Sequence, residues 1–249
     1  MKYITRDLGD SNEINIIPLS DVHIGEEGFN EKILDDVINR ALIEDTTYVI
    51  LIGDLINNAT KNSKSDVYHD AMTPHQQVNY IVDKLTPIKH KILGSVSGNH
   101  EDRTSRDSGI DLSEVIVKFL DIPYDSAAIV YQLKYGTSGS GKYNHVVYTT
   151  HGFGGGGTKG AKANKLQNLG NMCIADLYIM GHYHDVITFS DSIYVPDTRH
   201  DRIVLKRRQY LITGSCVEYG GYAEKMLLRP GRTGYPLVHM DNGEIKIIT

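Results

Sequence analysis

The stretch YVILIGD, residues 48–54, is a continuous apolar run that ends at Gly53 and Asp54. A short run without polar residues is typical of a strand buried on both faces, as strands are in parallel sheets. Similar runs occupy residues 13–19 and 91–96, and segments with helical spacing separate the three runs. Strands and helices therefore alternate in this part of the chain, which favours an α/β fold over an all-β one.

The two segments between these runs have the features of amphipathic helices. Residues 29–44 carry apolar side chains at 29, 33, 34, 37, 38, 41 and 42, which form one helical stripe. In the second segment, Thr73 can serve as the N-cap, Pro74 occupies the first helical position and Gln76 completes a capping box. We therefore expect this second helix to begin directly after Thr73.

The rest of the chain is richer in β signals. The predicted elements are paired strands at 129–135 and 145–150, a helix from about 159, a strand at 176–180, and β segments at 186–195, 202–205, 210–213, 235–240 and 244–248. The loop GTSGSGK (136–142) has the spacing of a phosphate-binding loop as far as its lysine, but a β-branched run follows instead of a helix. We interpret it as a hairpin loop.

Composition limits the class of protein. The 249 residues, 40% of them hydrophobic, can bury one sizeable core, so a single domain over residues 1–249 is expected. A formal charge of -5 gives no global basic field for nucleic acid, and two cysteines without CxxC spacing suggest no disulfide framework. The charged N-terminus does not resemble a signal peptide, and no apolar run approaches the ~18 residues of a membrane span. These features predict a cytoplasmic protein without membrane contact.

Five polar clusters each follow a strand-like run. They are SDVH (20–23), GD (53–54), GNHE (98–101), the single His151, and GHYH (181–184). Ligand sites in open α/β sheets gather at the carboxyl ends of strands, so these clusters can converge. Together they offer two Asp, one Asn and several His, a mixture that suits Mn, Fe(II) or Zn. Seven candidate ligands exceed the needs of one tetrahedral site, which predicts two metal ions.

The clusters DVH, GD, GNHE, H and GHYH, in this order, resemble the signature of the calcineurin-like metallophosphoesterase superfamily. The resemblance spans residues 21–184 and implies a four-layer α-β-β-α sandwich of two mixed β-sheets flanked by helices. It also implies two divalent metal ions, with manganese expected and Fe, Zn, Ni or Mg as alternatives. By this resemblance one metal is held by Asp21, His23 and His184, the other by Asn99, His151 and His182, and Asp54 bridges the two.

The resemblance further implies hydrolysis of phosphoester bonds by a hydroxide that two metal ions activate. His100 would contact the phosphate and protonate the leaving oxygen, and Glu101 could orient its imidazole. The alternative for His100 is a packing role beside the ligands. The family's members include phosphoprotein phosphatases, nucleotidases, phosphodiesterases and repair nucleases.

The sequence after Gly53 and Asp54 reads LINNAT, without the Asp-Arg-Gly of phosphoprotein phosphatases. A phosphodiester carries one negative charge and depends less on an arginine clamp, which favours a stand-alone phosphodiesterase or a nuclease. Arg103 and Arg106 could still act as such a clamp. The expected substrate contacts are Asn99, His100, Arg103, Gly154, Gly155 and Lys159.

Two further segments leave alternatives open. The glycines of residues 152–157 could present backbone N–H groups to phosphate or form a flexible lid, and the lysines at 159, 162 and 165 could bind a second phosphate or form a solvated helix face. The basic segment RHDRIVLKRR (199–208) could follow a nucleic-acid backbone, although an exposed hairpin is favoured.

Other functions remain alternatives. One is a nucleotide or small-molecule phosphomonoesterase; another is a nucleic-acid-binding or regulatory protein on the same fold. All seven candidate ligands are present and the chain has no Trp, which speaks against both non-enzymes. A homodimer is possible.

Overall fold

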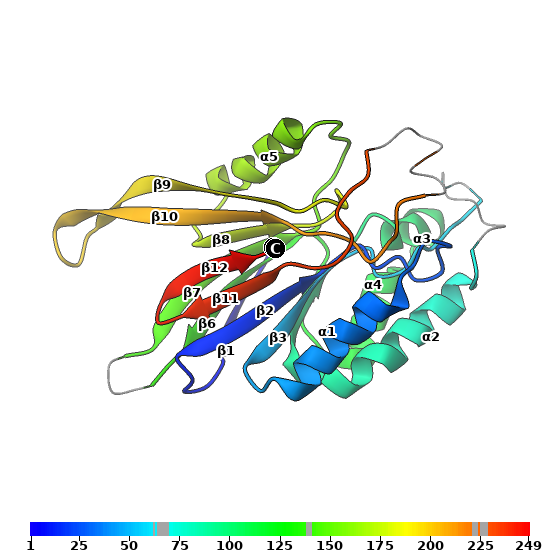
Figure 1. Cartoon of the computed structure of the whole chain (residues 1–249), viewed down its shortest axis with the longest axis horizontal. Coiled ribbons are helices and arrows are strands. Elements are labelled where there is room, and N and C mark those ends of the chain that lie inside the picture. Colours follow the sequence, from blue (N-terminus) through cyan, green and yellow to red (C-terminus); the bar gives the residue numbers. More distant parts are fainter. Residues whose placement is uncertain (62, 64–69, 138–140, 221–223, 225–228) are drawn as a thin grey trace.

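Two mixed six-stranded β-sheets pack face to face in the computed structural model, with helices on both outer sides (Figure 1). The structure describes residues 1–61, 63, 70–137, 141–220, 224 and 229–249. Apolar side chains from both sheets fill the space between them, among them Ile16, Ile50, Tyr131 and Ile179. The predicted α-β-β-α sandwich is confirmed.

The first sheet contains the strands on which the prediction began. Its order is β12 (Glu244–Ile248), β11 (Leu237–Asp241), β2 (Glu13–Leu19), β3 (Thr47–Ile52), β4 (Ile92–Val96) and β5 (Tyr124–Asp125). The strands from β2 to β5 are parallel, whereas β11 runs antiparallel to β2 and to β12. The carboxyl ends of β2, β3 and β4 therefore lie side by side at one edge of the sheet.

The second sheet mixes parallel and antiparallel pairs. Its order is β1 (Lys2–Asp7), β6 (Ala128–Tyr135), β7 (Tyr143–Thr150), β8 (Leu177–Met180), β10 (Arg202–Ile212) and β9 (Ile187–Asp197). Strands β6 and β7 form an antiparallel hairpin, as predicted for the segments around GTSGSGK. Residues 138–140 of that loop lie outside the described residues. Strand β8 runs parallel to both β7 and β10.

Helices cover the two sheets unequally (Figure 1). The first sheet packs on α1 (Glu31–Ile43), α2 (Pro74–Leu85) and α4 (Leu112–Leu120), and the second on α5 (Lys159–Asn168). A short polar helix, α3 (Glu101–Ser108), follows β4. Helix α2 begins as predicted, since the Thr73 side chain accepts from the Gln76 backbone and Gln76 completes the capping box. Among the described residues, no helix has both the length and the apolar character to cross a membrane.

The structure corrects the prediction for the C-terminal third. The segments 202–205 and 210–213 were expected as separate strands, but Arg202–Ile212 is one continuous strand. The charges between them misled the prediction, because Arg208 is buried in the sheet and its guanidinium donates to both carboxylate oxygens of Asp191 at 2.8 and 2.7 Å. Strands β1 and β5 and helices α3 and α4 were not predicted. Strand β5 has only two residues, and α3 has no apolar face.

Candidate metal centre

The five polar clusters meet at one end of the sandwich. They follow β2, β3 and β4 of one sheet and β7 and β8 of the other, and each begins within a few residues of its strand's last residue. Since these strands are neighbours within their sheets, their carboxyl ends bring the side chains together. Three groups of three side chains lie there, and within each group the ligand atoms are within 4.8 Å of one another: Asp21, His23 and His184; Asp54, His151 and His182; and His23, Asp54 and His100.

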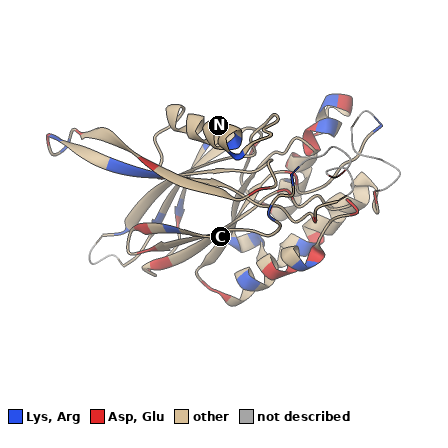
Figure 2. Ribbon diagram, turned by 45° about the horizontal axis from the view of Figure 1, so that its top comes forward, with Lys and Arg blue, Asp and Glu red and all other residues tan. Residues whose placement is uncertain are grey.

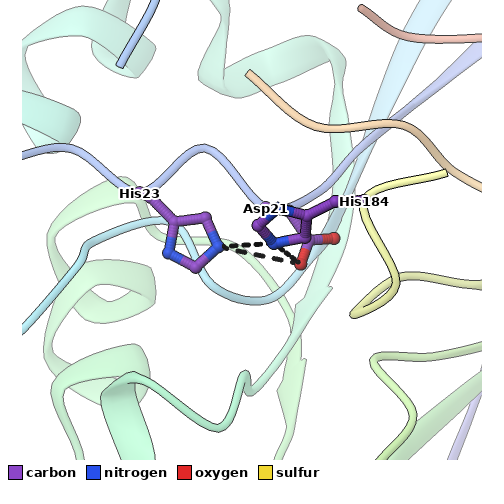
Figure 3. A group of neighbouring side chains, drawn as sticks. All are labelled: Asp21, His23 and His184. Atoms are coloured by element: carbon purple, nitrogen blue, oxygen red, sulfur yellow. Dashed lines mark hydrogen bonds and ion pairs between the residues drawn. The ribbon is translucent and has the colours of Figure 1, made fainter. Parts of the chain in front are cut away.

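The first group consists of Asp21, His23 and His184 (Figure 3). The two imidazole Nε2 atoms lie 3.0 Å apart, and Oδ1 of Asp21 is 3.2 Å from His184 Nε2 and 3.8 Å from His23 Nε2. The other Asp21 oxygen, Oδ2, accepts from the Ser20 hydroxyl and from the backbone N–H of His182. Oδ1 is thereby left facing the two imidazoles.

The second group is built around His151. Its Nε2 atom lies 3.2 Å from Oδ2 of Asp54 and 3.1 Å from Oδ1 of Asn99. The other ring nitrogen, Nδ1, donates to the carbonyl of Ile52 at 2.7 Å, so Nε2 is the ligand atom, and against the effect of burial Asp54 raises the pKa of His151 to about 10. His182 belongs to the same group, and its Nε2–H donates to the Gly154 carbonyl, so Nδ1 is its free ligand atom.

Asp54 connects the two groups through one oxygen. Its Oδ2 lies 3.2 Å from His151 Nε2 in the second group and 3.9 Å from His23 Nε2 in the first. Its Oδ1 accepts from the backbone N–H of His100 at 2.8 Å. A carboxylate that bridges two cations would need to lie in this position, and here a single oxygen faces both groups.

The residues fit bound cations better than they fit each other. Oδ1 of Asp21 is buried and has no hydrogen-bond partner among the described residues, although such atoms are normally satisfied. His23 Nε2 and His184 Nε2 cannot both donate across a 3.0 Å gap, whereas two lone pairs and a carboxylate oxygen are a ligand set for a divalent cation.

The backbone at these residues is strained. Asp21, His23, Asp54, His182 and His184 all have φ between 47° and 73°, in the left-handed region. Non-glycine residues seldom adopt this conformation, and the cost is about 1 to 3 kcal/mol each. Strain of this kind is concentrated at functional sites, so its occurrence at five of the seven candidate ligands is an independent sign that the site has a function.

Electrostatics keeps the two carboxyl groups ionised. Burial alone would raise the pKa of Asp21, but His184 and His23 hold it well below its usual value. The same balance, with His151 and His100 as the neighbours, holds the pKa of Asp54 far below its usual value. Both side chains are therefore anionic near neutral pH, as cation ligands must be.

His100 lies beside the two groups, with a contact on each ring nitrogen. Its Nδ1 donates to the Asn57 carbonyl at 2.8 Å, and its Nε2 accepts from Arg103 at 2.8 Å while lying 3.8 Å from Oδ2 of Asp54. Burial lowers the pKa of His100 to about 3 against the opposing effect of Asp54, so the ring is neutral. A second nitrogen of Arg103 donates to the same Asn57 carbonyl.

Glu101 has different contacts from those expected. Its buried carboxylate accepts three consecutive backbone N–H groups, those of Asp54, Leu55 and Ile56, at 2.6 to 3.1 Å, and the His100 imidazole is oriented by the Asn57 carbonyl. Burial and the neighbouring Asp54 raise the pKa of Glu101 to about 7. Asn57 in the LINNAT segment was not predicted to have a role, yet its carbonyl accepts from both His100 and Arg103.

The segment of glycines and lysines at 152–165 contacts the site through the Gly154 carbonyl, which accepts from the candidate ligand His182. Lys165 donates to the carbonyls of Phe153 and Gly155, and Lys162 forms an ion pair with Asp185 at 3.1 Å. Two of the three lysines therefore have partners within the protein, while Lys159 is exposed at the start of α5. The binding of a second phosphate by these lysines stays a prediction.

The basic segment 199–208 lies in the β9–β10 hairpin, in agreement with the favoured interpretation. Three of its cations face carboxylates: Arg202 pairs with Asp197, Lys206 with Asp176, and Arg208 with Asp191. Figure 2 shows blue and red segments alternating along this hairpin. The hairpin thus presents paired charges rather than a basic stripe.

Comparisons with known proteins give structural similarity only. No protein-family model matches the chain, and no curated protein matches it in sequence. A predicted phosphoesterase from Streptococcus pneumoniae is 15% identical, with 94% of this chain and 87% of that chain covered and a TM-score of 0.42. Vps29 from Entamoeba histolytica, solved with Zn²⁺, is 14% identical, with 94% of this chain and 90% of that chain covered and a TM-score of 0.45. The nuclease MPE from Pseudomonas putida is 15% identical, with 94% of this chain and 87% of that chain covered and a TM-score of 0.37.

The fold is the one that the sequence resemblance implied, two mixed β-sheets flanked by helices.

Proposed function

We propose that the protein is a metal-dependent phosphoesterase that favours phosphodiesters, with nucleic acid among its possible substrates. The observation that carries this proposal is the position of Asp54 Oδ2 between two groups of imidazole and carboxylate ligands. Asp21, His23 and His184 would hold one divalent cation, Asn99, His151 and His182 the other, and Asp54 both. Manganese is the first metal to test, because mixed oxygen and imidazole sets suit it.

When bound, two such cations would lower the pKa of a coordinated water towards about 7 and neutralise phosphate charge. The protein's own groups would act on the opposite side of the phosphate. Arg103 lies 2.8 Å from His100 Nε2 and has the forked donor geometry that phosphate oxygens accept. Once Arg103 turns to the phosphate, Nε2 of His100 would be free to take up a proton from solvent beside the phosphate anion and to give that proton to the leaving oxygen, which leaves the ring neutral again, while Nδ1–H stays on the Asn57 carbonyl.

The residues after Asp54 favour a diester. They lack the arginine of the phosphoprotein phosphatases, and a diester, which carries a single negative charge, depends less on guanidinium groups than a doubly charged monoester does, so Arg103 alone could serve it. A phosphomonoesterase remains the second candidate, with the same ligands. The two differ in the relative turnover of bis-p-nitrophenyl phosphate and p-nitrophenyl phosphate.

The test compares both substrates after chelation and addition of Mn²⁺. Asp54→Asn should lower bound metal and reduce turnover at least about 100-fold, because even the outer contacts of metal ligands are worth 10- to 100-fold. Asp83→Asn, an exposed aspartate on α2, is the matched control. Metal content measured by elemental analysis separates loss of metal from loss of chemistry.

Metal-dependent turnover that prefers the diester and falls in Asp54→Asn supports the proposal. Preference for the monoester would favour the second candidate function, a phosphomonoesterase. Bound metal without hydrolysis of either substrate rejects the enzymatic function.

A further inference from the structure

Phe153 projects from the edge of the candidate metal centre. It follows the ligand His151 by two residues, and its side chain is 81% exposed. The next residue, Gly154, accepts a hydrogen bond from the ligand His182 at 3.1 Å. An exposed aromatic ring thus belongs to the same short loop that contacts two candidate ligands.

The backbone beneath this ring is held in place. The Phe153 carbonyl accepts from the Tyr183 hydroxyl at 3.1 Å and from Lys165 Nζ at 3.2 Å. Lys165 Nζ also lies 5.7 Å from the centre of the Phe153 ring, within the range of a cation–π interaction. These contacts argue against the free lid that the glycines suggested.

The flanking glycines direct the ring outward. Gly152 and Gly154 have φ values of +89° and +75°, a conformation that other residues rarely adopt. A Cβ at Gly152 would lie 2.7 Å from Met180 and one at Gly154 would lie 3.1 Å from Lys165 Nζ. The positive φ values at both positions and the close approach of Gly152 to Met180 therefore favour glycine on both sides of the phenylalanine.

We propose that Phe153 stacks on a nucleobase next to the phosphodiester under attack. This inference rests on the proposed function and deepens it, because it names the substrate as a diester with an unpaired base, as in single-stranded nucleic acid. A planar ring held by its backbone, with a cation close to it, is what base stacking requires, and every base offers a π-face. Stacking of this kind tolerates sequence variation.

The test uses two ten-residue oligomers with the same phosphodiester backbone, one of thymidine and one of abasic tetrahydrofuran units, both labelled with fluorescein. Phe153→Leu keeps an apolar side chain but cannot stack, and should lower kcat/KM on the thymidine oligomer by about 5- to 150-fold. Phe153→Tyr should retain activity. Phe119→Leu, on the 66% exposed phenylalanine of α4, is the matched control and should change nothing.

The loss of activity caused by Phe153→Leu and the loss caused by removing the bases should not add. If Phe153 and the base contact each other, the wild-type protein already loses most of this factor on the abasic oligomer, and Phe153→Leu loses little more. A second measurement is binding by fluorescence anisotropy in the inactive His100→Ala background, where Phe153→Leu should weaken affinity for the thymidine oligomer alone.

Additive losses, or equal losses on both oligomers, overturn the inference. Hydrolysis of bis-p-nitrophenyl phosphate without hydrolysis of the thymidine oligomer also overturns it but leaves the proposed function standing. Hydrolysis of no substrate, despite bound metal, rejects the proposed function itself.

Discussion

Glu101 illustrates, at the residue scale, what a motif can and cannot reveal. The proximity of Glu101 to His100 in the motif GNHE suggested that its carboxylate orients the imidazole, but in the structure the carboxylate accepts the backbone N–H groups of residues 54–56. Glu101 is the first residue of α3 and His100 precedes it as the N-cap. Consecutive side chains at a helix start diverge by about 100°, so the His100 imidazole lies beside Arg103 and Asp54 while the Glu101 carboxylate turns to the backbone of the loop after β3.

Replacing this carboxylate should damage the site without removing a ligand. In Glu101→Gln one oxygen becomes an NH₂ group, which cannot accept from backbone N–H donors of residues 54–56. We expect about 1 to 3 kcal/mol of lost stability and a lower kcat, because Asp54 belongs to the same loop. Chemical denaturation and steady-state kinetics measure the two effects.

Glu114, which forms an exposed ion pair with Lys118, supplies the control for this substitution. Glu114→Gln should change stability by less than about 1 kcal/mol and leave kcat unchanged. Equal behaviour of the two variants would show that the hydrogen bonds of Glu101 do not position Asp54.

At the scale of elements, the site depends on how closely the loops after the strands approach one another. A Cβ at Gly98, between β4 and α3, would lie 2.0 Å from the Asp54 backbone nitrogen and 2.2 Å from its Oδ1 atom. At Gly181, after β8, it would lie 2.1 Å from the Ser20 hydroxyl. Glycine permits this approach where two elements carry ligands.

Gly98→Ala should therefore separate β3 from β4 at the ligands. We expect a loss of about 1 to 3 kcal/mol in the free energy of unfolding, as overpacking usually costs, together with weaker metal binding. Thermal denaturation with and without Mn²⁺ measures both. Gly160→Ala provides the contrast, because a Cβ there meets nothing within 4 Å and lies inside α5, so it should stabilise by up to about 1 kcal/mol.

The elements also show why prediction succeeded in some places and failed in others. The buried strands β2, β3 and β4 and helix α2 have the apolar runs and caps that the physics of burial and capping demands, so they were predicted nearly residue by residue. Strand β10 was divided because the buried ion pair between Arg208 and Asp191 looks in sequence like an exposed turn. The pairing of charges across strands depends on register, which local sequence does not encode.

For the whole molecule, the contact between the two sheets contains a buried histidine that the site does not use. His145 lies on the face of β7 that also carries the core residue Val147, and neither of its buried ring nitrogens has a hydrogen-bond partner among the described residues. Burial lowers the pKa of His145 below its ordinary value of about 6.5, against the opposing charge of Asp176. The folded protein therefore keeps this imidazole neutral.

Stability should consequently decline in acid. Below about pH 6.5 the unfolded chain binds a proton at His145 that the folded chain does not, so the free energy of unfolding falls by up to about 1.4 kcal/mol per pH unit from this residue. Urea titrations of metal-free protein at pH 7.5 and 5.5 measure the fall. His145→Phe should fall less steeply, since the other histidines are common to both proteins, and identical slopes would contradict this assignment.

The distribution of the ligands along the chain also affects how the protein folds. His23 and His184, whose imidazoles are 3.0 Å apart, are separated by 161 residues, and β2, which precedes the first ligands, is flanked by β11 from near the end of the described chain. Closing such long loops comes late, because their entropy is lost before the distant contacts form. We therefore expect a cation to bind at the candidate metal centre only after most of the fold has formed, and not to act as an early nucleus around which the chain collapses.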